Sequence, residues 1–171
     1  MNGYHVRHAQ LKDLKVLPEI EREAAARFAP YGLAGPLSTI LTPLDLFREG
    51  LEANRLWVAV DETNQPVGFA LANVVSDNAH LDELDVHPLH GRRGLGAALV
   101  EAVCDWAIAA GYHAVTLTTL RHVPWNAPWY ERLGFHVVEE SDLSEALRDL
   151  LQEEIQRGLP ADQRVAMLRE L

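Results

Sequence analysis

The stretch from His80 to Leu120 constrains the fold of this chain more than any other. It contains a strand pattern over 80–86, a glycine-rich turn, a helical pattern over 94–111 and a strand pattern rich in Val and Thr over 114–120. A strand, a crossover helix and a second strand in this order form a right-handed unit whose two strands are parallel. The turn then lies at the carboxyl end of the first strand, where sheets of this kind bind ligands.

Shorter patterns of both kinds surround this unit. Strands are predicted over 4–8, 56–60, 67–75, 135–138 and 164–168, where β-branched, aromatic or alternating residues gather. Helices are predicted over 11–28, 43–53, 125–133 and 143–156, mainly from apolar residues spaced by three and four. Residues 30–36 contain two Pro and two Gly and predict a loop. With 171 residues and neither a repeat nor a linker, the chain is predicted to form one α+β domain over 1–171.

The turn itself, Gly91-Arg92-Arg93-Gly94-Leu95-Gly96-Ala97, suits a phosphate ligand. Small residues let the backbone curl and bring successive N–H groups toward one point. The helix that begins there adds unpaired donors and the positive end of its dipole. Taken alone, the same residues also fit an ordinary strand-to-helix turn with two solvated arginines, because short glycine motifs are weakly specific.

The residues around this turn help to distinguish a phosphate site from an ordinary strand-to-helix turn. Leu81 to Leu99 reads LDELDVHPLHGRRGLGAAL and resembles the acetyl-CoA-binding motif of the Gcn5-related N-acetyltransferase (GNAT) superfamily. The resemblance implies an α+β fold with a central, mixed, mostly antiparallel twisted sheet of about six to seven strands, splayed at the cofactor site and flanked by helices. It also implies an N-acetyltransferase that moves an acetyl group from acetyl-CoA, as co-substrate and without a metal, to a primary amine.

The resemblance assigns the coenzyme contacts mostly to the backbone. N–H groups of Arg92, Arg93, Gly94, Gly96 and Ala97 would hold the pyrophosphate, and backbone groups of Leu84 and Val86 would hold the pantetheine arm. Two positions depart from the family pattern. Gly91 stands where Gln or Arg is usual, and Arg92 stands where a glycine is common.

A second motif lies in Asn126-Ala127-Pro128-Trp129-Tyr130-Glu131-Arg132-Leu133-Gly134-Phe135 and resembles the closing motif of the same family. The resemblance implies that Tyr130 acts as general acid toward the departing coenzyme A thiolate. The alternative is a core tyrosine with its hydroxyl at the surface. Asn126 is predicted either to contact the pantetheine or to cap the helix that follows it.

Candidates for the general base lie on the strand over 80–86. Residues two apart share a face of a strand, which groups His80, Asp82 and Leu84 on one side and Leu81, Glu83 and Asp85 on the other. Members of the family carry a catalytic Glu or His at the positions of His80 or Asp82, so these two lead. Glu83 is a third candidate, and bound water remains an alternative.

The resemblance implies that the loop at 30–43 and the region after Leu120 select the acceptor. Neither segment identifies the amine. The tail from 138 to 171 contains an acidic helix, for which solvation, a wall for a cationic substrate and a homodimer contact all remain open.

The net charge and the single cysteine limit which binding partners and which cellular compartment are compatible with the sequence. Fifteen Lys and Arg against 25 Asp and Glu give a formal net charge of -10, which disfavours nucleic acid and anionic membranes. The single cysteine, Cys104, lies in an apolar run and is predicted to be a small buried side chain. The N-terminus lacks the apolar run of a signal peptide, so a cytoplasmic location is expected.

Two other classes of protein are alternatives to the N-acetyltransferase. A catalytically degenerate acyl-CoA-binding or regulatory module would keep the glycine loop without turnover, and Gly91 together with the absence of an obvious Glu base motivates it. A dinucleotide-dependent oxidoreductase would need a complete glycine fingerprint after an early strand, which this chain lacks.

Overall fold

The computed structural model describes residues 3–33, 35, 37 and 40–171. Residues 34, 36, 38 and 39, which belong to the loop predicted at 30–43, therefore lie outside the described part. Two compact units make up the chain, Met1–Ala72 with Glu83–Trp106 and Asn73–Asp82 with Ala107–Leu171. Each unit is described by itself below. The expectation of one domain over 1–171 stays a prediction.

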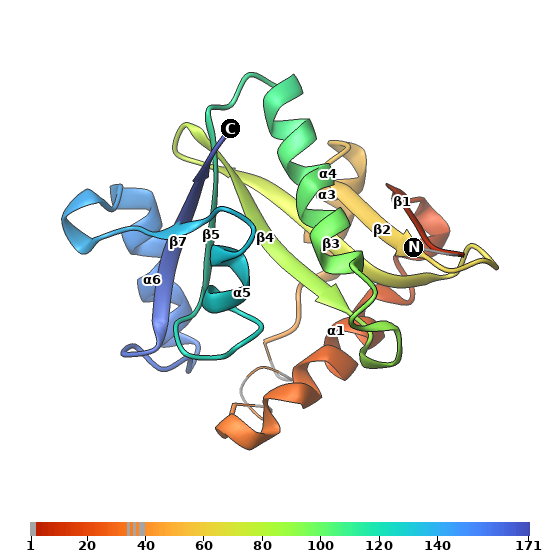
Figure 1. Cartoon of the computed structure of the whole chain (residues 1–171), viewed down its shortest axis with the longest axis horizontal. Coiled ribbons are helices and arrows are strands. Elements are labelled where there is room, and N and C mark those ends of the chain that lie inside the picture. Colours follow the sequence, from red (N-terminus) through yellow and green to blue (C-terminus); the bar gives the residue numbers. More distant parts are fainter. Residues whose placement is uncertain (1–2, 34, 36, 38–39) are drawn as a thin grey trace. The chain divides into compact units, whose positions relative to one another are not determined.

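The fold class is α+β, as predicted, with seven strands in the order β1-β2-β3-β4-β5-β7-β6 (Figure 1). The sheet is open and mixed, because β4 and β5 pair in parallel while the β1–β2, β2–β3, β5–β7 and β6–β7 pairs are antiparallel. The strands are β1 (His5–His8), β2 (Leu56–Val60), β3 (Pro66–Val75), β4 (Asn78–Val86), β5 (Ala114–Leu120), β6 (His136–Val137) and β7 (Arg164–Glu170). The α-helices are α1 (Leu17–Ala25), α3 (Leu44–Glu52), α4 (Leu95–Ala109), α5 (Ala127–Glu131) and α6 (Glu145–Gln156), with 3-10 turns η1 (Leu11–Asp13), η2 (Ala26–Tyr31), η3 (Pro88–His90) and η4 (Glu140–Asp142).

The long helix predicted over 11–28 is divided into η1, α1 and η2. Pro18 stands in the first turn of α1, where its missing N–H leaves no hydrogen bond unmade. The last segment, η2, contains Pro30 and ends at Gly32, whose φ of 71° is left-handed. The apolar spacing correctly predicts the buried face, but the helix is interrupted between Asp13 and Leu17 and becomes a 3-10 turn after Ala25.

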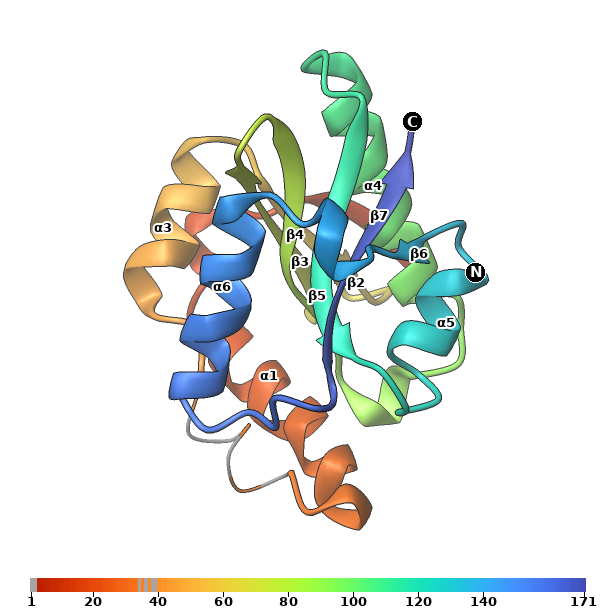
Figure 2. The ribbon, with the colours of Figure 1, turned by 90° about the vertical axis from the view of Figure 1, so that its left-hand side faces the viewer.

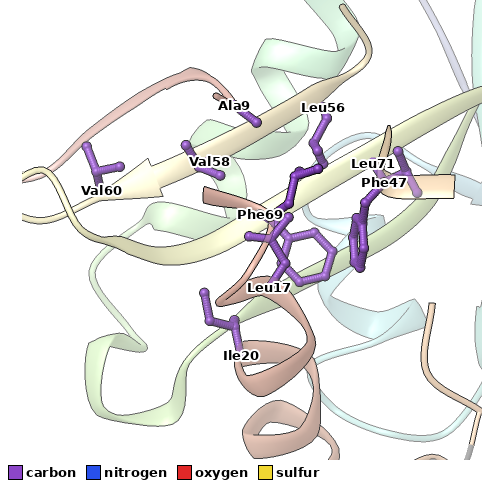
Figure 3. Packing of buried hydrophobic residues seen from close by; sticks show 10 residues of the cluster. Ala9, Leu17, Ile20, Phe47, Leu56, Val58, Val60, Phe69 and Leu71 are labelled. Carbon is purple, nitrogen blue, oxygen red and sulfur yellow. The ribbon is translucent and has the colours of Figure 1, made fainter. Parts of the chain in front are cut away.

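An apolar core fills one side of the first unit. Leu56, Val58 and Val60 alternate along β2, and with Phe69 and Leu71 of β3 they pack against the helices. Leu17 and Ile20 of α1 and Phe47 of α3 complete this cluster with Leu14 and Ala9, and Phe47 meets Phe69 edge to face at 5.2 Å between ring centroids (Figure 3). Helix α1 is thereby fixed against the centre of the β2–β3 pair.

The opposite side of the same strands faces α4. Trp57, which alternates with the core residues of β2, lies 6.0 Å from Trp106 of α4 between ring centroids. Cys104 on α4 is buried, as predicted, and acts as a small apolar side chain. Strands β2 and β3 are therefore covered on both faces, which explains why every residue of β2 is buried.

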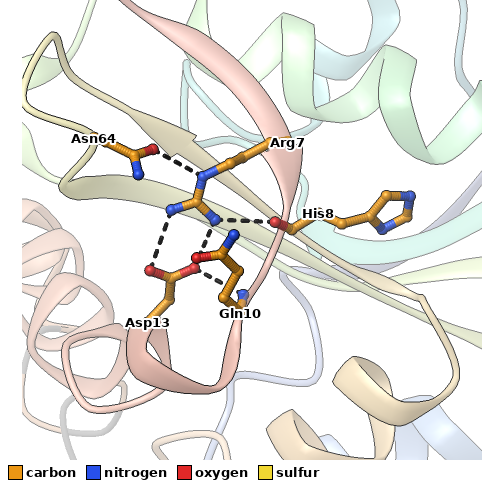
Figure 4. A network of polar contacts seen from close by, with 5 residues as sticks. All are labelled: Arg7, His8, Gln10, Asp13 and Asn64. Atoms are coloured by element: carbon orange, nitrogen blue, oxygen red, sulfur yellow. Dashed lines mark hydrogen bonds and ion pairs between the residues drawn. The ribbon is translucent and has the colours of Figure 1, made fainter.

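A polar network joins β1 to the start of the helical segment (Figure 4). The Arg7 guanidinium donates to Asp13 at 2.7 Å, to Asn64 at 2.9 Å and to the His8 carbonyl at 3.0 Å. The Gln10 N–H also donates to Asp13, at 2.8 Å. Burial opposes ionisation of Asp13, but these hydrogen bonds and the Arg7 charge outweigh it and leave its pKa below the usual value.

The second unit is built on β5 and β7, which pair over seven residues from Ala114–Glu170 to Leu120–Arg164. Helix α6 lies along these strands (Figure 2) and is tied to them by a closed network. Thr118 donates to Glu154 at 2.6 Å, Arg164 pairs with Glu154 at 2.7 Å, and Arg164 also donates to Thr118 at 2.9 Å. The parallel pairing of β4 with β5 covers Ala79–Leu81 and Val115–Leu117.

Candidate functional site

The glycine loop has the backbone geometry of an anion site. After η3, Gly91 is extended with a φ of -64° and a ψ of 166°. Arg92 and Gly94 follow with left-handed φ angles of 58° and 80°. Helix α4 then begins, and the Ala98 N–H donates to the Gly94 carbonyl at 3.0 Å. The amides of residues 95–97 therefore form the first helical turn, whose N–H groups have no partner within a helix.

Alternating left-handed residues aim neighbouring N–H groups toward one side of the backbone, an arrangement that binds anions. The positive end of the α4 dipole adds to this preference. Gly94 is required by its φ angle rather than by space, since a Cβ placed there meets no described heavy atom within 4 Å. Arg92 adopts a conformation that usually costs a residue with a side chain about 1 kcal/mol or more.

Tyr4, near the N-terminus, contacts this loop. Its hydroxyl lies 3.0 Å from Nδ1 of His90, and the Arg93 guanidinium lies over its ring at 5.5 Å from the centroid. Desolvation, together with the nearby His87 and Arg93 charges, lowers the pKa of His90. The contact with His90 and the cation–π contact with Arg93 together fix Tyr4 against the loop. No local sequence pattern connects Tyr4 with residues more than eighty positions away.

Strand β4 leads into the loop, and β3 approaches it closely. A Cβ at Gly68 would lie 2.8 Å from the Asp85 carbonyl oxygen and 3.3 Å from the Val86 Cα. The His87 N–H donates to the Val67 carbonyl at 2.8 Å, which fixes the end of the strand. Leu84 and Val86, the predicted pantetheine contacts, are half-buried on this last part of β4.

Two acidic residues of the first unit, Asp85 and Glu21, have raised pKa values. Burial raises the pKa of Asp85 well above its usual value, and the negative charges of Glu83 and Glu21 raise it further against the opposing Arg27 charge. Burial also raises the pKa of Glu21, on α1. Glu83 is half-buried, and its Oε1 accepts from the Leu84 N–H at 3.3 Å.

His80 lies at the start of β4, in the second unit, and only 1% of its surface is exposed. Its Nδ1 is 2.8 Å from the Thr116 hydroxyl, which itself donates to the Ala79 carbonyl at 3.3 Å. Because the hydroxyl proton is used there, we assign Nδ1 of His80 as the donor to Thr116. Desolvation, and secondarily the Arg164 charge, lowers the pKa of His80 to about 4. Asp82, two residues along, is exposed.

The second motif forms α5 and the turn after it, also in the second unit. Tyr130 is 8% exposed, and its ring lies 5.6 Å from that of Phe135 between centroids. The Asn126 carbonyl accepts from the Trp129 and Tyr130 N–H groups, while its side chain makes no cap hydrogen bond in the described structure. Instead, Nδ2 donates to Thr119 at 2.8 Å, and Oδ1 is buried with no hydrogen-bond partner in the described part of the chain.

Comparison with known proteins agrees with this geometry. The model of the acetyltransferase (GNAT) family matches residues 8–135, about three quarters of the chain. The chain belongs to this family. Both motifs lie within the matched range, so the predicted membership and fold are confirmed.

The chain resembles peptidyl-lysine N-acetyltransferase YjaB of Escherichia coli, with 32% identity over 101 residues that span 59% of this chain and 63% of that protein. Among solved structures, one similar to this chain is N-acetylglutamate synthase from Neisseria gonorrhoeae, in complex with coenzyme A and N-acetyl-glutamate. The TM-score is 0.74 and the sequence identity is 16%, and the match covers all of this chain and 36% of that chain. PaiA N-acetyltransferase from Thermoplasma acidophilum, in complex with coenzyme A, has a TM-score of 0.69 and 15% identity over 98% of this chain and 99% of that one. These two structures establish the fold.

Sequence reasoning missed two of the acidic residues. Glu21 lies between Ile20 and Ala24 on the buried stripe of α1, and a charge on an apolar stripe was the available signal. The predicted strand alternation places Asp85 on the face opposite His80 and Asp82. No helix in the described residues is long and apolar enough to cross a membrane.

Proposed function

We propose that this protein is an acetyl-CoA-dependent N-acetyltransferase that acts on a primary amine of a small molecule or of a protein or peptide, by direct attack in a ternary complex. The observation that carries the proposal is the loop before α4, with left-handed residues at Arg92 and Gly94 and the helix amides directly after them. The coenzyme A in the two similar solved structures and the lysine specificity named for the Escherichia coli relative support it.

The residues present fit the coenzyme. Backbone N–H groups of Arg92, Arg93, Gly94, Gly96 and Ala97 would hold the pyrophosphate, and the two guanidinium groups would add positive charge in a chain of net charge -10. Since Gly91 offers no side chain, that first contact of the family pattern is absent here, and the backbone carries the binding.

The pantetheine arm would bind to backbone groups of Leu84 and Val86, as an added strand pairs with a strand edge. Asn126 of the second unit is proposed separately as a pantetheine contact, because its buried carbonyl oxygen, without a described donor, fits an amide N–H of the ligand. Thr119 fixes the Asn126 side chain in the orientation that leaves this oxygen available.

Acetyl-CoA supplies a thioester, whose carbonyl carbon the amine attacks. A protonated amine must first lose a proton, and Asp82, Glu83, His80 or water would accept it. His80 is poorly suited to this role, because protein encloses it and desolvation lowers its pKa to about 4. As the N–C bond forms and the C–S bond breaks, the thiolate takes a proton from Tyr130, which regains one from solvent or from the amine nitrogen.

The role of Tyr130 is tested by Tyr130→Phe, which removes one oxygen and keeps the ring packing against Phe135. We expect kcat at saturating amine to fall about 100-fold, typical of losing a general acid, with little change in acetyl-CoA affinity. Tyr112→Phe, the same change elsewhere in the second unit, should leave kcat unchanged. An unchanged kcat in Tyr130→Phe would remove the acid role.

Release of free thiol from acetyl-CoA in the presence of a panel of amines tests the activity itself. The enzyme should release thiol with at least one amine and form the corresponding acetamide in equal amount. Binding of acetyl-CoA without turnover across a wide panel would instead favour the degenerate acyl-CoA-binding module. The net charge of -10 leads us to infer an enzyme without a nucleic-acid partner.

A further inference from the structure

Tyr4 lies just before β1, in the first unit, and contacts the glycine loop through two residues. Its hydroxyl lies 3.0 Å from Nδ1 of His90, in a half-buried hydrogen bond. The two rings also meet edge to face, with 5.8 Å between their centroids. The Arg93 guanidinium lies over the Tyr4 ring, 5.5 Å from its centroid. One side chain thus joins the beginning and the end of the segment 90–93.

The backbone that carries Tyr4 is itself held by the sheet. The next residue, His5, pairs with Val60 in the antiparallel β1–β2 ladder. Arg7, further along β1, donates to Asn64 in the turn between β2 and β3, at 2.9 Å. These hydrogen bonds do not involve the glycine loop. Tyr4 therefore projects from a support that is fixed independently of the loop.

The segment that Tyr4 spans contains the strained residue of the loop. Arg92 has a left-handed φ of 58°, a conformation that a residue with a side chain keeps only where surrounding contacts hold it. His90 precedes it by two positions and ends η3, where the His90 N–H donates to the His87 carbonyl at 2.8 Å. Arg93 follows it directly. The contacts of Tyr4 therefore restrain the chain on both sides of Arg92.

We propose that Tyr4 is a positioning residue for the coenzyme, which acts through His90 and Arg93 to keep the glycine loop in its anion-binding conformation. The inference rests on the proposed function and adds to the coenzyme site a residue that lies outside both sequence motifs. Only molecules with a correctly formed loop bind the phosphates tightly, so the apparent affinity falls with the fraction of such molecules. A loop that is restrained before binding also loses less conformational entropy on binding.

Tyr4→Phe removes the hydrogen bond to His90 and keeps the ring beneath Arg93. We expect Kd and KM for acetyl-CoA to rise about threefold to tenfold, the range for losing one hydrogen bond of this kind. Both kcat at saturating substrates and KM for the amine should stay unchanged, because the loop is proposed to hold the pyrophosphate and not the acetyl group. Tyr4→Leu also removes the cation–π contact and should add a further factor of about two to five. Tyr112→Phe, the same change in the second unit, should leave all these constants unchanged.

His90→Phe provides a second test, because it keeps an aromatic ring and removes the Nδ1 atom that Tyr4 contacts. It should weaken acetyl-CoA binding about as much as Tyr4→Phe. The double variant should bind acetyl-CoA no more weakly than the weaker of the two single variants, since both remove the same contact. A loss in the double variant equal to the product of the two single losses would show that Tyr4 does not act through His90.

A purely structural role of Tyr4 predicts a different result. Lower stability reduces the fraction of folded protein, and hence kcat per mole of protein, while the folded molecules keep their affinity for acetyl-CoA. Melting curves of each variant measure this fraction. If the wild type binds acetyl-CoA and releases thiol, a Kd in Tyr4→Phe within twofold of the wild-type value would overturn this inference alone. Failure of the wild type to bind acetyl-CoA would instead reject the proposed function.

Discussion

At the scale of single residues, Arg92 combines an unfavourable backbone with a useful charge. Its φ of 58° lies in the left-handed region, where a Cβ is crowded and glycine is not. The family pattern often has glycine at this position, and the observed angle gives the physical reason. Retaining an arginine here costs stability and adds a cation to the loop that is proposed to bind phosphate.

Arg92→Gly should therefore raise the free energy of unfolding, by about 1 kcal/mol, and weaken acetyl-CoA binding at the same time. Urea denaturation and calorimetric titration measure the two effects. Arg93→Gly is the control, because Arg93 is not among the left-handed residues and glycine should lower the stability there. A less stable Arg92→Gly variant would show that the side chain stabilises the loop more than the backbone strains it.

Most of the proposed coenzyme contacts could be predicted from the sequence, because they lie in contiguous motifs whose glycine and helix chemistry is local. The raised pKa values of Glu21 and Asp85 could not be predicted. Burial raises both, and it depends on how distant segments of the chain pack. His80 was predicted from its strand position, but its burial against Thr116 depends on the parallel pairing with β5.

At the scale of elements, the approach of β3 to the end of β4 depends on one glycine. Gly68→Ala would place a methyl group 2.8 Å from a backbone oxygen that cannot rotate away. We expect a loss of about 1–3 kcal/mol in the free energy of unfolding, together with weaker acetyl-CoA binding as Leu84 and Val86 shift. Gly35→Ala, where a Cβ meets no described heavy atom within 4 Å, should change both quantities little. An unchanged Gly68→Ala variant would contradict the close approach.

The attachment of α6 to strands β5 and β7 depends on one buried glutamate. Glu154 is largely enclosed and joins Thr118 of β5 to Arg164 of β7. Glu154→Gln should lower the free energy of unfolding by about 1–3 kcal/mol, because Arg164 then remains as a partly buried charge without its counterion. Glu153→Gln disrupts the neighbouring exposed pair with Arg157 and should cost less than about 0.5 kcal/mol. Denaturation curves of both variants make the comparison, and equal losses would contradict it.

At the scale of the whole molecule, two sets of buried groups give opposite pH dependences of stability. His80 is neutral in the folded protein down to about pH 4, but it takes up a proton near pH 6.5 when unfolded. The contribution of neutral His80 to the free energy of unfolding is therefore lost as the pH falls from 6.5 to about 4. Glu21 and Asp85 have raised pKa values in the folded protein. Their contribution to the free energy of unfolding is therefore lost as the pH rises through those values.

His80→Gln isolates the first of these effects. The difference in unfolding free energy between wild type and variant should change by about 3 kcal/mol between pH 7 and pH 4, with the wild type losing more stability in acid. Denaturation at several pH values measures this difference. His113→Gln, at an exposed position in the same unit, should follow the wild-type curve. Parallel curves for the wild type and His80→Gln would show that His80 ionises normally.

The sequence alone determined the local elements and the family. Strands 56–60 and 114–120 have the predicted bounds, because β-branched runs between turn residues encode them locally. Tertiary structure decided what depends on distant partners. Strand β7 extends to Glu170 because Arg169 and Glu170 pair with Val115 and Ala114 of β5, although polar residues end the local pattern at 168. In the same way, the glycine loop can be predicted from a contiguous motif. The contact of Tyr4 with His90 and the hydrogen bonds from Thr42 to Glu21 exist only because folding places separate segments together.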